Sequence, residues 1–177
     1  WLHMTAFLYD AVTVNPTNAA VAHETLAQLD RYGIQVVGVS HTSFHVGTML
    51  SGEPARDVSA QHGYYIEWLR DYYTGWKTLA TEFSEVKIWE IDNEMNNADF
   101  MCAINGNKVY SLREMADIAT DMLYYASRGI HEANPKAETV LGGLTEPTGL
   151  GSGQNKTFLQ YLYDNIKSGD FGYFYFE

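Results

Sequence analysis

The pair Asn93–Glu94 is the part of the sequence whose residue types best fit chemistry. It follows the apolar run VKIWEI (86–91), which has the composition of a buried strand. At the end of such a strand, Glu94 can meet water while Trp89 and Ile91 form an apolar wall behind it. Partial withdrawal from water makes a carboxylic acid keep its proton to higher pH, as a general acid must. The amide of Asn93 can donate a hydrogen bond to a substrate hydroxyl.

A second carboxylate, Glu90, lies inside the same run. Parallel strands are normally covered on both faces, so we expect the segment IWEI to be enclosed and Glu90 to lie at interior depth. Two roles fit such an acid, a hydrogen-bonded or ion-paired core residue and a substrate contact. We favour the core role.

Strand-like and helix-like segments alternate along the chain. Runs rich in β-branched and aromatic residues predict strands, and apolar residues spaced by three and four predict the helices between them. The predicted strands are 1–9, 34–40, 86–91, 139–144 and 171–177, and the predicted helices lie within 16–33, 65–83, 111–133 and 158–169.

Local signals set several of the predicted helix ends. Pro16 suits a helix entry, and Gly33 suits the residue that follows a helix. The segment SLRE (111–114) has the spacing of a capping box, and Asn134–Pro135 stops the helix that it starts.

This alternation predicts an α/β fold with parallel strands joined by helical crossovers. Two architectures fit it, an open doubly wound sheet and part of a (β/α)8 barrel. Both place their active sites at the carboxyl ends of the strands, which is where Asn93 and Glu94 are expected.

Length and composition narrow the class of protein. With 177 residues, 46% hydrophobic and 19% charged, the chain is long enough for one globular domain. Its net charge of −11 repels nucleic acid and anionic lipid, so we expect neither as a partner. The single cysteine, Cys102, leaves no cysteine cluster for zinc, and we expect no metal and no cofactor. The apolar runs are shorter than a membrane span.

The segment WEIDNE (89–94) resembles the strand-four signature of clan A glycoside hydrolases, which are retaining enzymes on a TIM barrel. Further similarity covers most of the chain and is nearest in character to the β-xylosidase and α-L-iduronidase family. The similar segments are LDRYGIQVVGV, SLREMADIATDMLYYASRGIHEANPKAETVLGGL and FLQYLYDNIKSGDFGYFYFE. The resemblance implies that residues 1–177 form a single incomplete (β/α)8 catalytic domain covering about strands two to six.

The resemblance also implies roles for individual residues. Glu94 would be the acid/base, and Asn93 would bind the sugar 2-hydroxyl beside the scissile bond. His41, His3 and Trp89 complete the expected substrate contacts, although an ordinary loop histidine is an equal alternative for His41. Relatives often carry an arginine in strand two, where this chain has WLH with His3 in the corresponding position.

A retaining mechanism requires a second carboxylate, and the resemblance assigns it to no residue of this chain. It should lie roughly 5 to 5.5 Å from the first, and the family places it at the end of strand seven, beyond this chain. Glu146 and Glu177 are weaker alternatives. We therefore expect an inactive chain on its own, with a carbohydrate substrate and the rest of the barrel as partners, secreted or periplasmic rather than cytoplasmic.

Two rival functions remain open from the sequence. One is a carbohydrate-binding or scaffold protein that has the same fold without the chemistry. The other is an unrelated doubly wound protein, for which a phosphate-binding loop would be the usual sign. The segment GLGSG (149–153) follows a predicted strand but lacks the G-x-G-x-x-G spacing of such a loop.

Overall fold

The structure is a computed structural model, and it describes residues 2–3, 13–40, 62–97, 110–145 and 153–169. Within these ranges strands and helices alternate, as the sequence predicts. The elements in chain order are β1 (Leu2–His3), α1 (Pro16–Arg31), β2 (Val37–Ser40), α3 (His62–Glu82), β3 (Ile88–Ile91), α4 (Leu112–Ala133), β4 (Glu138–Leu141) and α5 (Gln154–Ser168).

The strands form one small parallel sheet in the order β1-β2-β3-β4. Each strand is therefore added beside the strand that precedes it in the chain, always in the same direction across the sheet. In the register, Val39, Glu90 and Val140 are neighbours in one row, and Gly38, Trp89 and Thr139 are neighbours in the next. The predicted α/β fold with parallel strands is confirmed.

The helix ends follow the predicted local signals. The Asn15 side chain accepts from the amides of Thr17 (3.1 Å) and Asn18 (3.2 Å) just ahead of Pro16, and Gly33 beyond the helix has a φ of +67°. At α4, the Glu114 amide donates to Ser111 Oγ at 3.2 Å. The Ser111 amide donates in turn to Glu114 Oε2 at 2.8 Å, which closes the predicted capping box.

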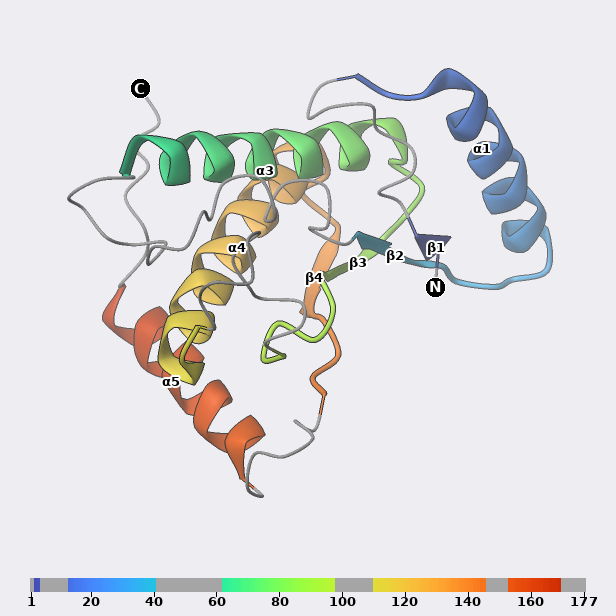
Figure 1. The fold of residues 1–177 in the computed structure, drawn as a ribbon. Coiled ribbons are helices and arrows are strands. Elements are labelled where there is room, and N and C mark those ends of the chain that lie inside the picture. The colour runs from blue at the N-terminus through green and yellow to red at the C-terminus, as the bar shows by residue number, and fades with distance from the viewer. Residues whose placement is uncertain (1, 4–12, 41–61, 98–109, 146–152, 170–177) are drawn as a thin grey trace.

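The described helices gather on one side of the sheet. In Figure 1 they follow one another in an arc around the strands. On that side Trp89 and Ile91 of β3 are 0% exposed, and the Trp89 ring meets Trp76 of α3 edge-on at 5.9 Å between centroids. A Cβ at Gly38 would lie 2.7 Å from the Trp89 ring, so the glycine leaves the room that this ring occupies.

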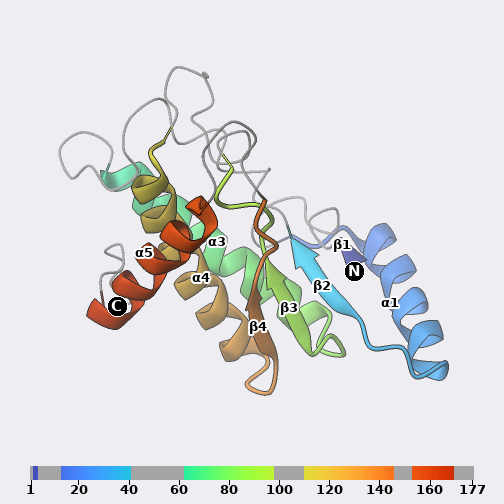
Figure 2. The same ribbon diagram turned by 90° about the horizontal axis from the view of Figure 1, so that it is seen from below.

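On the other face of the sheet, Ile88 and Glu90 are half-buried and Val140 is 41% exposed. Figure 2 shows this sheet with α3 and α4 on its far side. The prediction that IWEI is enclosed on both faces is therefore wrong for the described part of the chain. Trp89 and Ile91 are buried because only the face to which they belong is packed against helices.

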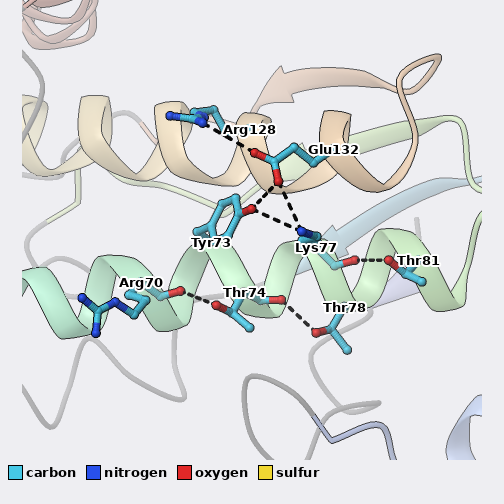
Figure 3. A network of polar contacts seen from close by, with 8 residues as sticks. All are labelled: Arg70, Tyr73, Thr74, Lys77, Thr78, Thr81, Arg128 and Glu132. Atoms are coloured by element: carbon cyan, nitrogen blue, oxygen red, sulfur yellow. Dashed lines mark hydrogen bonds and ion pairs between the residues drawn. The ribbon is translucent and has the colours of Figure 1, made fainter. Parts of the chain in front are cut away.

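The contact between α3 and α4, which we call the α3–α4 seam, is close. A Cβ at Gly129 would lie 2.5 Å from the carbonyl oxygen of Tyr73. Across the seam the Tyr73 hydroxyl and Lys77 Nζ both donate to Glu132 (Figure 3). These hydrogen bonds, with that from Tyr73 the strongest influence, lower the pKa of Glu132. The seam thus combines backbone contact with an ionic cluster at its edge.

A buried amide joins α5 to α4. Asn165 is 1% exposed, and its oxygen accepts from Arg113 at 2.6 Å. Its nitrogen donates to Asp117 at 2.8 Å and to Thr120 at 3.1 Å. Such a satisfied polar group fixes how the two helices pack. None of the described helices is both long and apolar enough to span a membrane.

Candidate active site

The chain leaves β3 in an unusual backbone conformation. Asp92 has a φ of 61° and Glu94 a φ of 51°, and both are non-glycine residues. This left-handed region costs an L-residue roughly 1–2 kcal/mol, so it persists only where the surroundings impose it. The two residues flank Asn93, so the strained segment coincides with the pair singled out from the sequence.

The end of β4 imposes this conformation. The Gly142 amide donates to the Ile91 carbonyl at 3.1 Å, and the Glu94 amide donates to the Gly143 carbonyl at 2.7 Å. A Cβ at Gly142 would lie 2.0 Å from the Asp92 carbonyl oxygen, a distance that no side chain tolerates. Only glycine therefore lets the two strand ends approach this closely.

A turn beyond Glu94 directs its carboxylate. The Asn97 amide donates to the Glu94 carbonyl at 2.8 Å, and Asn97 Nδ2 donates to Glu94 Oε2 at 3.1 Å. Within the described residues Glu94 forms no salt bridge, and its Oε1 has no hydrogen-bond partner. The side chain is half-exposed. One carboxylate oxygen is thus held, while the other is open to a ligand or a proton.

Asn96 anchors the same turn from below. Its side chain is 1% exposed. The Thr145 amide donates to Asn96 Oδ1 at 3.1 Å, and Asn96 Nδ2 donates to the Thr145 carbonyl at 2.7 Å. Nδ2 also donates to Asn155 Oδ1, in the first turn of α5, at 2.6 Å. The turn is therefore tied to both β4 and α5.

A buried acidic residue, Asp92, follows β3 directly. Asp92 is 3% exposed, and its Oδ1 accepts from the Asn93 amide at 2.7 Å. Burial raises the pKa of the Tyr72 phenol well above its usual range, and the charge of Asp92 raises it further. Tyr72 therefore stays neutral at ordinary pH.

Two further polar residues, Glu90 in β3 and Asn93 just after it, lie close to Gly143. Asn93 is half-buried, and its side-chain oxygen lies 3.6 Å from where a Cβ of Gly143 would be. Glu90 Oε1 accepts from the Gly143 amide at 3.2 Å. This hydrogen bond gives Glu90 a role in holding the end of β4, but the side chain is half-buried rather than at the interior depth expected of a core residue.

Trp89 does not belong to the site. Its side chain is 0% exposed between Gly38 and Trp76, so no sugar can stack on it, and the prediction of a substrate contact is wrong. Alternation along β3 turns both Trp89 and Ile91 toward the helices, away from any ligand at the strand ends. They therefore do not form the expected wall behind Glu94.

The remaining predicted residues stay untested. His3 pairs with Val39 in the register, in the row that continues to Glu90, but its side chain is not described. His41, Glu146 and Glu177 lie outside the described residues.

Sequence reasoning missed Asn97. Its signal was a polar residue three positions after Glu94, the spacing at which a turn folds a side chain back. That contact also needs the positive φ of Glu94, and a positive φ cannot be predicted from the residue type glutamate.

Two hollows stand out in the described structure. One, of about 700 Å³, lies beside β4 between α4 and α5, and the other, of about 430 Å³, lies between α1 and the start of β2. Neither includes Asn93 or Glu94. In the described ranges no group of three or more histidine, cysteine or acidic side chains is placed to hold a metal ion.

No family model, curated protein or solved structure matches this chain.

Proposed function

We propose that this chain carries the acid/base half of a retaining glycoside hydrolase active site. The observation that carries the proposal is the setting of Glu94, at the carboxyl end of an inner strand of a parallel sheet. There Asn97 holds Oε2 while Oε1 is open. Strain at Asp92 and Glu94 supports the same site, because costly backbone conformations cluster where function requires them.

The arrangement of the helices favours a barrel over a doubly wound sheet. A doubly wound sheet has helices on both faces, whereas a (β/α)8 barrel has them only outside. The described helices lie on one side, and Val140 on the other face is 41% exposed. We therefore infer that these strands are part of a barrel wall whose inner face the rest of the protein completes.

In the proposed reaction, Glu94 protonates the glycosidic oxygen as the bond to the anomeric carbon breaks. A second carboxylate, supplied outside this chain, takes up that carbon as a glycosyl ester. Glu94, now ionised, then removes a proton from the water that hydrolyses the ester, which returns both carboxyl groups to their starting states. Asn93 holds the neighbouring hydroxyl of the sugar.

The test uses the complete protein that contains this chain, assayed on a panel of aryl glycosides. Glu94→Ala should lower kcat/KM by about 10²–10⁴-fold for substrates with poor leaving groups, which need the acid. The loss should be much smaller for activated aryl leaving groups. Azide needs no base to attack the ester, so it should restore turnover and give a glycosyl azide of retained configuration.

Glu138→Gln serves as the matched control, because Glu138 is an exposed glutamate at the other end of the sheet. It should leave all rates unchanged. Full activity in Glu94→Ala would overturn the proposal, as would an unmutated protein that hydrolyses none of the panel. Glycoside binding without hydrolysis would favour the non-catalytic binding protein instead.

A further inference from the structure

The turn that directs Glu94 is held at both of its ends. Before the turn, the Glu94 amide donates to the Gly143 carbonyl at 2.7 Å. After it, Asn97 donates to Glu94 by its backbone amide, at 2.8 Å to the carbonyl, and by Nδ2, at 3.1 Å to Oε2. Asn97 directly follows Asn96, whose side chain is buried. The contacts of the Asn96 side chain therefore set where Asn97 lies and how it holds the carboxylate.

The hydrogen bonds of Asn96 leave only one orientation for its amide group. The Thr145 amide can only donate, so the atom that it reaches at 3.1 Å must be Oδ1. The atom 2.7 Å from the Thr145 carbonyl must then be the donor Nδ2. Nδ2 donates its second hydrogen to Asn155, 2.6 Å away, which has to present its oxygen, Oδ1. This buried side chain is thus satisfied, and one of its partners comes from α5.

Asn155 belongs to a helix that is itself held in place. It lies in the first turn of α5, 59 residues from Asn96 in the chain. Near the other end of α5, Asn165 ties the helix to α4 by donating to Asp117 and Thr120. A group presented by a packed helix keeps its position better than one on a loop. Asn155 is therefore a fixed acceptor for the turn.

Removing this acceptor would act on Glu94 without touching it. A buried N–H of Asn96 would lose its partner, which is unfavourable, so the turn would shift until water or another acceptor reached that N–H. Asn97 would move with the turn, and so would the carboxylate that it holds. We propose that Asn155 is a positioning residue, which directs Glu94 from α5 through the side chain of Asn96. The inference rests on the proposed function, because positioning has a measurable effect only if Glu94 transfers a proton.

The complete protein that contains this chain tests the proposal on aryl glycosides with poor and with activated leaving groups. Asn155→Ala should lower kcat/KM for the poor leaving groups about 10- to 100-fold, since a small displacement of a catalytic group has effects of this size. Activated leaving groups need little protonation, so their kcat/KM should change less than about twofold. Asn155→Asp keeps a side-chain oxygen for Asn96 and should restore most of the lost activity.

Asn165→Ala is the matched control. Asn165 is also a buried asparagine of α5, but its hydrogen bonds join it to α4. The variant should unfold at a lower urea concentration and keep the leaving-group dependence of the unmutated protein. In an Asn96→Ala background, Asn155→Ala should cause no further change in that dependence. Circular dichroism verifies that each variant is folded, and serine replaces alanine at a position where it is not.

Comparison with Glu94→Ala separates failure of this inference from failure of the proposed function. If Glu94→Ala shows the leaving-group dependence and Asn155→Ala equals the unmutated protein, the positioning role is overturned and the proposed function stands. An Asn155→Ala variant that loses the same factor on every substrate would also overturn the role, as would an Asn155→Asp variant no more active than Asn155→Ala. If Glu94→Ala has no effect on any substrate, both are overturned.

Discussion

Two close contacts in the molecule each depend on a glycine that lets two backbones touch, but they differ in conformation. One is the α3–α4 seam, and the other, which we call the rim, is the contact between residues 92–94 after β3 and residues 142–143 after β4. In the seam, Gly129 lies within a regular helix and faces the Tyr73 carbonyl. At the rim, Gly142 faces the Asp92 carbonyl, and the residue it contacts is held at a φ of 61°. Close packing therefore supports regular structure in one region and enforces irregular structure in the other.

This difference indicates where stability and function are separated in the molecule. The seam is made of helices in favourable geometry, joined by the cluster around Glu132. The rim carries two residues, Asp92 and Glu94, whose left-handed backbone conformation costs free energy on folding, and contacts with the end of β4 and with α5 hold them there. Changes in the seam should therefore affect unfolding, whereas changes at the rim should affect both unfolding and the orientation of Glu94.

The largest effect is expected from Gly142→Ala. The added Cβ would meet the Asp92 carbonyl at 2.0 Å, so the strand ends must separate, at a cost of about 3 kcal/mol in the free energy of unfolding. Urea denaturation measures this loss. Gly143→Ala is the matched control, because its Cβ meets only the Asn93 side chain at 3.6 Å. Equal costs at the two positions would contradict the close contact described for the rim.

Gly129→Ala should weaken the seam by about 2 kcal/mol in the same measurement. Alanine is favoured over glycine inside a helix by about 1 kcal/mol, so a net loss requires a real collision. The collision expected here is with the Tyr73 carbonyl, at 2.5 Å. A stabilised variant would mean that the two helices are farther apart than described.

At Glu94 the usual preference between alanine and glycine should be reversed. Because φ is 51°, Glu94→Gly should be more stable to urea than Glu94→Ala by about 1 kcal/mol. At Glu24, an exposed position in α1, glycine should be less stable than alanine by a similar amount. If glycine is the less stable residue at both positions, the strain assigned to Glu94 is absent.

The smallest effect concerns the contact of α1 with the end of α3. Hydrogen bonding to Glu82 is the main cause that raises the pKa of His23 above 6.5, and Glu85 adds to it. Because the pKa of His23 is higher in the folded chain than in the unfolded chain, the protonated ring stabilises the fold. This stabilisation is complete below about pH 6 and is lost as the pH rises through the pKa of the folded state. Relative to His23→Gln, the protein should lose less than about 1 kcal/mol between about pH 6 and pH 8, since the pair is exposed. Parallel stability curves for the two proteins would remove His23 from this role.

Local signals in the sequence predicted most of the fold. Pro16, Gly33 and the Ser111–Glu114 capping box act within a few residues of themselves, so their meaning does not depend on the rest of the chain. The position of Asn93 and Glu94 at the end of a strand followed in the same way. Strand lengths were less predictable, because pairing with a neighbour decides where a strand ends, and β3 is shorter than the apolar run that contains it.

The site itself was only partly predictable. Trp89 was misassigned because an aromatic residue next to a polar pair fits a sugar platform and a helix contact equally well, and only the packing of Trp76 decides between them. The pair Gly142–Gly143 is visible in the sequence, but its reason, contact with Asp92, arises between segments about 50 residues apart. Such non-local contacts leave no pattern in a single sequence.

The turn from Glu94 to Asn97 closes on itself, through one backbone and one side-chain hydrogen bond. The carboxylate is thus held by a residue only three positions away, on a backbone that Gly143, Thr145 and Asn155 hold in place. The segment between Asn97 and α4 can therefore change in length or sequence without removing the contacts that direct the acid. Variation in whatever the protein recognises is therefore separable, in evolution or in the laboratory, from the group that would carry the proton.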